Sequence, residues 1–205
     1  MEIVLLIFTS TVFIVGTEIL TRKFALPTAS TRRFIHIGTA TVAGLAPFFA
    51  TRDQLILVCI IFIVLLLLGR SYKLFSAIHG IDRKSFGDIY LPLGVILSAL
   101  IFLPQDTHIF QFGIFIMGIS DAVAGFVGEK FGKHNIEVYS NKKSLEGSIA
   151  FFICSLILTF VFFPIFGYQL LIIPIILTMT EFGLVHGFDN LILPIIAGFL
   201  ARLLF

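Results

Sequence analysis

The chain has 205 residues, of which 58% are hydrophobic and only 13% are charged, with a formal net charge of +2 at pH 7. Soluble domains carry roughly 25% charged residues, so a water-soluble fold would leave much of this apolar surface exposed. The small net charge gives no support for nucleic-acid binding, which needs a strongly basic surface. We therefore expect an all-α, polytopic integral membrane protein that forms a single transmembrane domain over residues 1–205.

Long uncharged stretches recur at lengths close to the roughly 20 residues that cross a bilayer as a helix. Eight spans are expected, at residues 3–20, 34–50, 54–69, 89–104, 109–131, 147–163, 168–184 and 191–204. The division between the sixth and seventh spans is the least defined, because no charged residue occurs from Gly147 to Thr180. Only residues 164–167 (Pro-Ile-Phe-Gly) indicate a turn there, so seven helices, one of them longer, stay open as an alternative.

Basic residues alternate between the loops. Four of them lie in or at the edge of each loop that follows the first, third and fifth spans, and only Arg52 and Arg202 lie elsewhere. Loops kept in the cytoplasm are enriched in Lys and Arg, so this pattern predicts cytoplasmic placement for these three loops and an outside location for both termini. The second of these loops, residues 70–85, fits either an amphipathic helix at the membrane surface or an ordinary basic loop.

Ionisable residues at membrane depth are expensive and usually serve a site. In the predicted topology, those near the cytoplasmic ends of the helices are Glu18, His36, Asp88, Asp121, Glu181, His186 and Asp189. Chemistry is therefore expected at the cytoplasmic face. A transporter would distribute such groups through the membrane depth, so transport is the less favoured interpretation from a different functional class.

Asp121 lies in a stripe of glycines. Gly118, Asp121, Gly125, Gly128 and Gly132 are spaced three or four residues apart and share one face of a helix. Such a stripe is common where membrane helices pack closely, which is one interpretation. In the other, glycine admits a ligand to the backbone, as at Gly125 and Gly128, and the carboxylate holds a divalent cation.

A basic loop follows the stripe. Lys133, Lys142 and Lys143 lie there with Ser144, whose hydroxyl is placed to cap the next helix, and with Glu146 in the first turn of that helix. Lysines beside a metal carboxylate suit a polyphosphate, because phosphoryl transfer depends mostly on positioning and charge neutralisation. Alternatively, these lysines serve only topology and anionic lipids.

These residues carry a resemblance to a known family. The segments Asp121-Ala-Val-Ala-Gly125, Phe131-Gly-Lys133 and Lys142-Lys-Ser-Leu-Glu-Gly147 resemble the diacylglycerol/polyprenol kinase family, which includes dolichol kinase, phytol kinase and CTP-dependent diacylglycerol kinase. They resemble phosphatidate cytidylyltransferase more distantly. Weaker matches are Arg33-Phe-Ile-His36, the segment at 85–92, and Glu181 with Asp189-Asn190-Leu191.

The resemblance implies an enzyme that transfers the γ-phosphate of CTP to a lipid hydroxyl with Mg²⁺ or another divalent cation. The implied metal ligands are Asp121, Glu146 and Asp189, and the implied CTP contacts are Lys133, Lys142, Lys143, Ser144, Gly125, Gly128 and Asn190. The implied catalytic set is Asp121, Lys143, Glu146, His36 and Asp88. His36, one helical turn from Arg33, suits a phosphate contact or a general base.

The acceptor is expected to be an isoprenoid alcohol, such as a polyprenol, dolichol, phytol or geranylgeraniol. Diacylglycerol is an alternative acceptor, and cytidylyl transfer to phosphatidate is an alternative reaction. The latter is disfavoured because residues 185–191 depart from the terminal motif of that family, and because no Lys or Arg occurs between Lys143 and Arg202. The expected partners are CTP, the lipid alcohol and membrane lipids, and the oligomeric state is left open.

Overall fold

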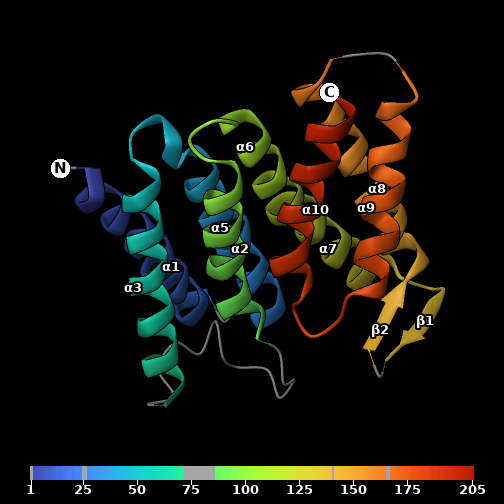
Figure 1. Ribbon diagram of the computed structural model, residues 1–205. Coiled ribbons are helices and arrows are strands. Elements are labelled where there is room, and N and C mark those ends of the chain that lie inside the picture. Colours follow the sequence, from blue (N-terminus) through green and yellow to red (C-terminus); the bar gives the residue numbers. More distant parts are fainter. Residues whose placement is uncertain (1, 25–26, 72–85, 140, 165–166) are drawn as a thin grey trace.

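Helices make up almost all of the described chain (Figure 1). The structure, a computed structural model, describes residues 2–24, 27–71, 86–139, 141–164 and 167–205. The helices are α1 (Glu2–Phe24), α2 (Thr28–Leu45), α3 (Arg52–Ser71), α5 (Gly87–Phe102), α6 (Thr107–Phe115), α7 (Asp121–Phe131), α8 (Leu145–Phe162), α9 (Gln169–Gly183) and α10 (Asp189–Leu204). A short 3-10 turn, η1 (Ala46–Phe48), follows α2, and a π-helical turn, η2 (Ile116–Ser120), joins α6 to α7.

Because α6, η2 and α7 are continuous over Thr107–Phe131, the described residues contain eight helical runs, as predicted. The uncertain sixth and seventh spans are separate, since α8 ends at Phe162 and α9 begins at Gln169. The interfacial helix considered at 70–85 lies almost wholly outside the described residues.

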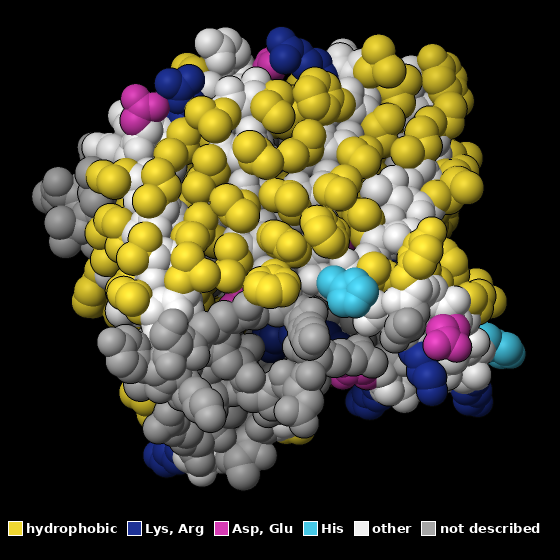
Figure 2. All heavy atoms as spheres, turned by 60° about the horizontal axis from the view of Figure 1, so that its bottom comes forward, with side chains coloured by type: hydrophobic (Ala, Val, Ile, Leu, Met, Phe, Trp, Pro, Cys, Tyr) yellow, Lys and Arg dark blue, Asp and Glu magenta, His cyan; other side chains and the backbone are white. Residues whose placement is uncertain are grey.

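The outer surface of the helices is apolar. Figure 2 shows hydrophobic side chains covering the helical body, with charged side chains gathered toward its rims. By length and composition, three runs suffice to cross a membrane, namely Arg52–Gly69, Thr107–Phe131 and Leu145–Phe162, and shorter apolar helices occupy Leu6–Thr17, Gly87–Phe102 and Gln169–Gly183. On α3, Leu57, Ile60 and Val64 are each nearly half exposed, which suits contact with lipid. The chain is an integral membrane protein of the predicted all-helical class.

Helix α10 is held close to α5 and α6 by glycines. A Cβ atom on Gly94 of α5 would lie 2.2 Å from the backbone oxygen of Asn190, and one on Gly113 of α6 would lie 2.4 Å from that of Pro194. Such close backbone approach is typical of packed membrane helices. It fixes the first turn of α10, which carries two of the predicted site residues, against the start of α5.

A β-hairpin separates α7 from α8, where only a loop was expected. Strand β1 (Asn135–Val138) pairs antiparallel with β2 (Asn141–Ser144), and Glu137 lies opposite Lys142. The hairpin projects from the end of the helical body (Figure 1). Strands of four residues are too short to show a clear alternation of polar and apolar residues, so sequence periodicity does not reveal them.

Candidate active site

A cavity of about 910 Å³ opens at the charged end of the helical body. The groups that line its polar end are four basic side chains, Arg32, Arg33, Lys142 and Lys143, and five acidic ones, Asp88, Asp121, Glu129, Glu181 and Asp189. They come from α2, α5, α7, β2, α9 and α10. Helices that are distant in the sequence therefore meet around one polar chamber.

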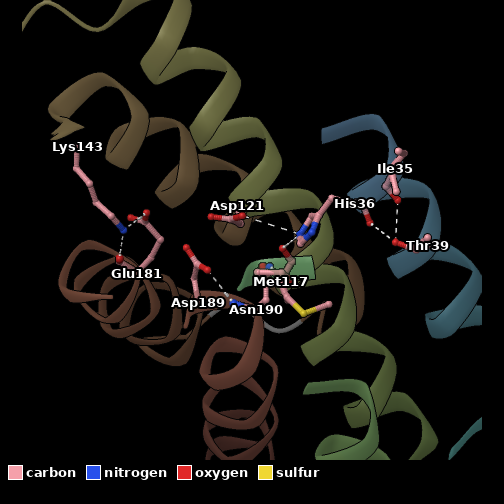
Figure 3. A network of polar contacts seen from close by, with 10 residues as sticks. Ile35, His36, Thr39, Met117, Asp121, Lys143, Glu181, Asp189 and Asn190 are labelled. Atoms are coloured by element: carbon pink, nitrogen blue, oxygen red, sulfur yellow. Dashed lines mark hydrogen bonds and ion pairs between the residues drawn. The ribbon is translucent and has the colours of Figure 1, made fainter. Parts of the chain in front are cut away.

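Asp121 enters this chamber at the point where the helix changes its winding. It is the first residue of α7, directly after the π-helical turn η2. Such turns insert an extra residue into a helix and are frequent at functional sites. In Figure 3, Asp121, Glu181 and Asp189 point toward a common space from three different helices. Asp189, Glu181, Lys143 and Arg32 all lie close enough to act electrostatically on the Asp121 carboxylate.

His36 faces Asp121 from α2. Its Nε2 atom lies 3.1 Å from the backbone oxygen of Met117 and 3.9 Å from Oδ2 of Asp121. A carbonyl oxygen can only accept a hydrogen bond, so Nε2 carries the hydrogen. In the neutral ring the lone pair then lies on Nδ1, and only that nitrogen can take a proton.

Lys143 is joined to Glu181 across the chamber. Its Nζ atom lies 2.5 Å from Oε1 of Glu181 and also donates to the backbone oxygen of the same residue. The two side chains are only 15% and 8% exposed, respectively. The pair connects β2 to the last turn of α9. A phosphate bound at Lys143 would therefore share the ammonium group with the Glu181 carboxylate.

The start of α10 supplies Asp189 and Asn190. Oδ1 of Asp189 accepts the Asn190 N–H at 2.9 Å, a position in which a carboxylate also suits the positive end of the helix. The Asn190 side chain donates to the backbone oxygen of Gly87 at 2.8 Å. Its buried Oδ1 has no hydrogen-bond partner among the described residues.

The glycine face of α7 is occupied by neighbouring side chains. A Cβ atom on Gly125 would lie 2.8 Å from Nε of Arg33, and one on Gly128 would lie 2.8 Å from Oγ of Ser144. Arg33 crosses Gly125 to pair with Glu129, with Nη1 2.8 Å from Oε2. Close packing therefore accounts for these glycines, although both also line the cavity.

Ser144 caps α8 as the sequence predicted. Its Oγ accepts the N–H of Gly147 at 3.1 Å, and the residue is buried. Glu146 lies in the first turn of α8, also as predicted.

Most of the predicted site residues line the cavity. They are His36, Asp88, Asp121, Gly125, Gly128, Lys142, Lys143, Ser144, Asp189 and Asn190. Lys133 and Glu146 instead line a separate shallow depression beside Phe131. Three residues after Ser144, Gly147 lies on the same inward face at the start of α8, so Glu146 faces another direction. The Glu146 carboxylate instead accepts a hydrogen bond from Nδ1 of His134 at 2.8 Å.

The predicted metal set of Asp121, Glu146 and Asp189 is therefore not assembled in one place. Among the described residues, no three His, Cys, Asp or Glu side chains are grouped to hold a metal ion by themselves. Besides Asp189, the carboxylate that acts electrostatically on Asp121 in the chamber is Glu181. Its signal in the sequence was an acidic residue at the end of a long uncharged run.

Three further charged residues at the chamber carried weaker signals. Arg32, Arg33 and Glu129 line the cavity, and none of them belonged to the predicted set. Arg32 was explained by membrane topology alone, Arg33 carried only the weak family match Arg33-Phe-Ile-His36, and Glu129 lies in the last turns of α7 beside Lys130. Only the packing of α2 against α7 shows that they face a site.

Comparison with known proteins supports a common family. Residues 2–197 match the Cytidylyltransferase family. A phytol kinase of Synechocystis sp. is 25% identical over 197 residues, which cover 92% of this chain and 84% of that protein. An uncharacterised protein of Methanocaldococcus jannaschii is 30% identical over 116 residues, or 56% of each chain. No solved structure matches the chain.

Proposed function

The chain belongs to the Cytidylyltransferase family, and from that membership we propose that it is a CTP-dependent lipid-alcohol kinase. The acceptor would be an isoprenoid alcohol of the phytol or polyprenol type. The observation that carries the proposal is a single membrane-protein cavity whose polar end combines four basic side chains with the carboxylates of Asp121 and Asp189. The likeness to a phytol kinase over 92% of the chain favours phosphoryl transfer to an alcohol.

The balance of charges at the chamber supports a divalent cation as part of this proposal. Five acidic side chains outnumber the four basic ones, so the chamber alone does not neutralise a triphosphate. Mg²⁺ is usually held by one or two carboxylates together with substrate phosphates, and it does not require a complete protein cage. Asp121 and Asp189 fit this pattern, because Glu181 is already paired with Lys143. When bound there, the ion would neutralise charge that develops on the transferred phosphoryl group.

The reaction would proceed by in-line attack on the γ-phosphorus. The oxygen of the lipid alcohol forms a bond to the γ-phosphorus, while the bond between the γ-phosphorus and the β,γ-bridging oxygen breaks and CDP leaves. Arg32 and Lys142 would neutralise the phosphates, with Arg33 shared between phosphate and Glu129 and Lys143 shared between phosphate and Glu181. The hydroxyl proton would pass to Nδ1 of His36, since Nε2 donates to the Met117 carbonyl.

Cytidylyl transfer is the second candidate, because the matching family bears that name. The two reactions give different products from the same nucleotide. Kinase activity yields CDP and a phosphorylated alcohol, whereas cytidylyl transfer to phosphatidate yields pyrophosphate and a CDP-lipid.

Purified protein in detergent, supplied with Mg²⁺ and CTP labelled at the γ-phosphate, decides between them. We expect label in the lipid product when phytol, geranylgeraniol or a polyprenol is the acceptor. ATP in place of CTP tests the nucleotide, and diacylglycerol tests the acceptor class. Labelled pyrophosphate with phosphatidate, and no labelled alcohol phosphate, would replace the kinase proposal by the second candidate.

A further inference from the structure

The cavity does not end at the charged residues. It continues between α1, α2, α3 and α5, where apolar side chains line it. We call this part the tail groove and define it by Ala43, Leu55, Cys59, Phe62, Leu91 and Val95. On α2 alone the lining passes from Arg32 and His36 at the polar end to Ala43 in the groove.

The length of the groove can be measured along α3. Leu55 and Leu66 both line the cavity and are eleven residues apart, which corresponds to about 16 Å of helix. This is about half of the roughly 30 Å hydrocarbon thickness of a bilayer. The groove therefore leads from the polar rim into the depth of the membrane.

Unfilled apolar space of this extent is unusual in a packed protein, where voids larger than a water molecule are few. Its walls offer little to a polar ligand, and it is continuous with the chamber that holds Asp121 and His36. An occupant with a polar head at the chamber and an apolar chain in the groove fits both parts.

We propose that the tail groove binds the hydrophobic chain of the acceptor alcohol and admits one chain. The inference rests on the proposed function for the identity of the head group. Pockets of about 300–1,000 Å³ normally hold one drug-sized ligand. Because one cavity of about 910 Å³ must take both a nucleoside triphosphate and the tail, single-chain alcohols fit it better than two-chain glycerolipids.

Two neighbouring residues of α3 provide a matched test. Cys59 is 7% exposed and lines the groove, whereas Ile60 is 47% exposed and lies outside the cavity lining. Cys59→Phe fills the groove partway along its length. We expect it to lower kcat/KM for geranylgeraniol and phytol by about tenfold or more, because a chain of several isoprene units loses its pocket. Geraniol, which is shorter, should be phosphorylated at a rate near that of the unmodified protein, and Ile60→Phe should leave the whole chain-length profile unchanged.

The thiol of Cys59 also reports occupancy without catalysis. In a Cys154→Ala background, Cys59 is the only cysteine of the chain, and its alkylation by an apolar maleimide is followed in detergent without nucleotide. Geranylgeraniol should slow this reaction severalfold, and dioleoylglycerol at the same concentration should not. A control protein carries Cys59→Ala, Cys154→Ala and Ile60→Cys, and its alkylation should be insensitive to either lipid.

The outcomes separate this proposal from the proposed function. If geranylgeraniol protected Cys59 in a protein that phosphorylates no alcohol, the chain-binding role of the tail groove would be supported and the kinase proposal would be overturned. Kinase activity with no protection, or with the same chain-length profile in Cys59→Phe as in the unmodified protein, would overturn the groove alone. Equal protection by dioleoylglycerol would overturn the single-chain assignment and show a general lipid site.

Discussion

At the residue scale, Asp121 is the carboxylate that interacts with several of the other charged groups in the chamber. It lies 3.9 Å from His36, and Asp189, Glu181, Lys143 and Arg32 act on it electrostatically. A packing role would make its charge dispensable, since replacing a buried charge in an apolar setting is often neutral or stabilising. A role at a metal and nucleotide makes the charge essential.

We therefore expect Asp121→Asn to abolish turnover in a protein that still folds. Loss of a metal-centred interaction in the transition state should lower kcat on the order of a thousandfold or more. The measurement is CTP-dependent phosphorylation together with the thermal midpoint in detergent. Asp53→Asn is the matched control, because Asp53 is 80% exposed at the opposite rim. Normal turnover by a well-folded Asp121→Asn protein would contradict the site.

Lys143 combines a structural role with a proposed functional one. In Lys143→Met, the carboxylate of Glu181 stays buried without its partner, which should cost about 3–5 kcal/mol of stability and lower the thermal midpoint. The double variant Lys143→Met/Glu181→Gln removes both charges and should recover most of this loss. It should not recover phosphorylation, because the cation for the phosphates is still missing.

The comparison of thermal midpoint and kcat in these two variants separates the roles. If turnover returned together with stability in the double variant, Lys143 would serve the fold alone. Lys133→Ala is the reference variant, because Lys133 lies outside the cavity, and it should change kcat and the thermal midpoint less than Lys143→Met does.

At the scale of elements, the position of α10 decides where Asp189 and Asn190 lie. The helix touches α5 through Gly94 and α6 through Gly113, and Asn190 bonds to the backbone of Gly87. The neighbouring atoms at both glycines are backbone oxygens, which cannot rotate away as a flexible side chain would. A side chain added at either glycine would therefore have to move the backbone of α10.

Gly94→Ala should destabilise the protein by about 1–3 kcal/mol, because the new methyl group meets the Asn190 carbonyl at 2.2 Å. It should also lower turnover, since the displaced helix carries Asp189. Gly16→Ala on α1 is the matched control, because a Cβ atom there meets nothing within 4 Å. Thermal unfolding in detergent compares the two, and equal midpoints would show that α10 is not held as described.

At the scale of the whole molecule, the two rims of the helical body differ. The far rim carries Arg52 beside Asp53 and an ion pair between Arg202 and Asp106, whose nitrogen and oxygen lie 3.4 Å apart. The other rim carries the chamber and the hairpin. Together with the alternating basic loops, this asymmetry supports the proposal that the chamber opens to the cytoplasm.

Cysteine labelling tests that orientation. In a background with Cys59 and Cys154 replaced by alanine, a cysteine at Glu137 on the hairpin should react with a membrane-impermeant maleimide only after the cells are opened. A cysteine at Gln105, between α5 and α6, should react in intact cells. The reverse pattern would place the chamber outside.

Much of the architecture follows from the sequence, because membrane insertion depends on local hydrophobicity. The spans from 109–131 and 147–163 correspond to α6–α7 and to α8 within two residues at each end. The cap by Ser144 was equally predictable, since an N-cap is a contact between residues three apart. Acidic residues at span ends also pointed to the rim that carries the chamber.

Tertiary structure alone decided which charged groups meet. Glu146 and Glu181 are both acidic residues near a span end, yet only Glu181 faces the chamber, where it binds a lysine 38 positions earlier. The tail groove is likewise a product of tertiary structure, because its lining residues come from four helices, α1, α2, α3 and α5. Hydrophobicity places a helix in the membrane but leaves its rotation open, and rotation is set by contacts between helices that no local pattern records.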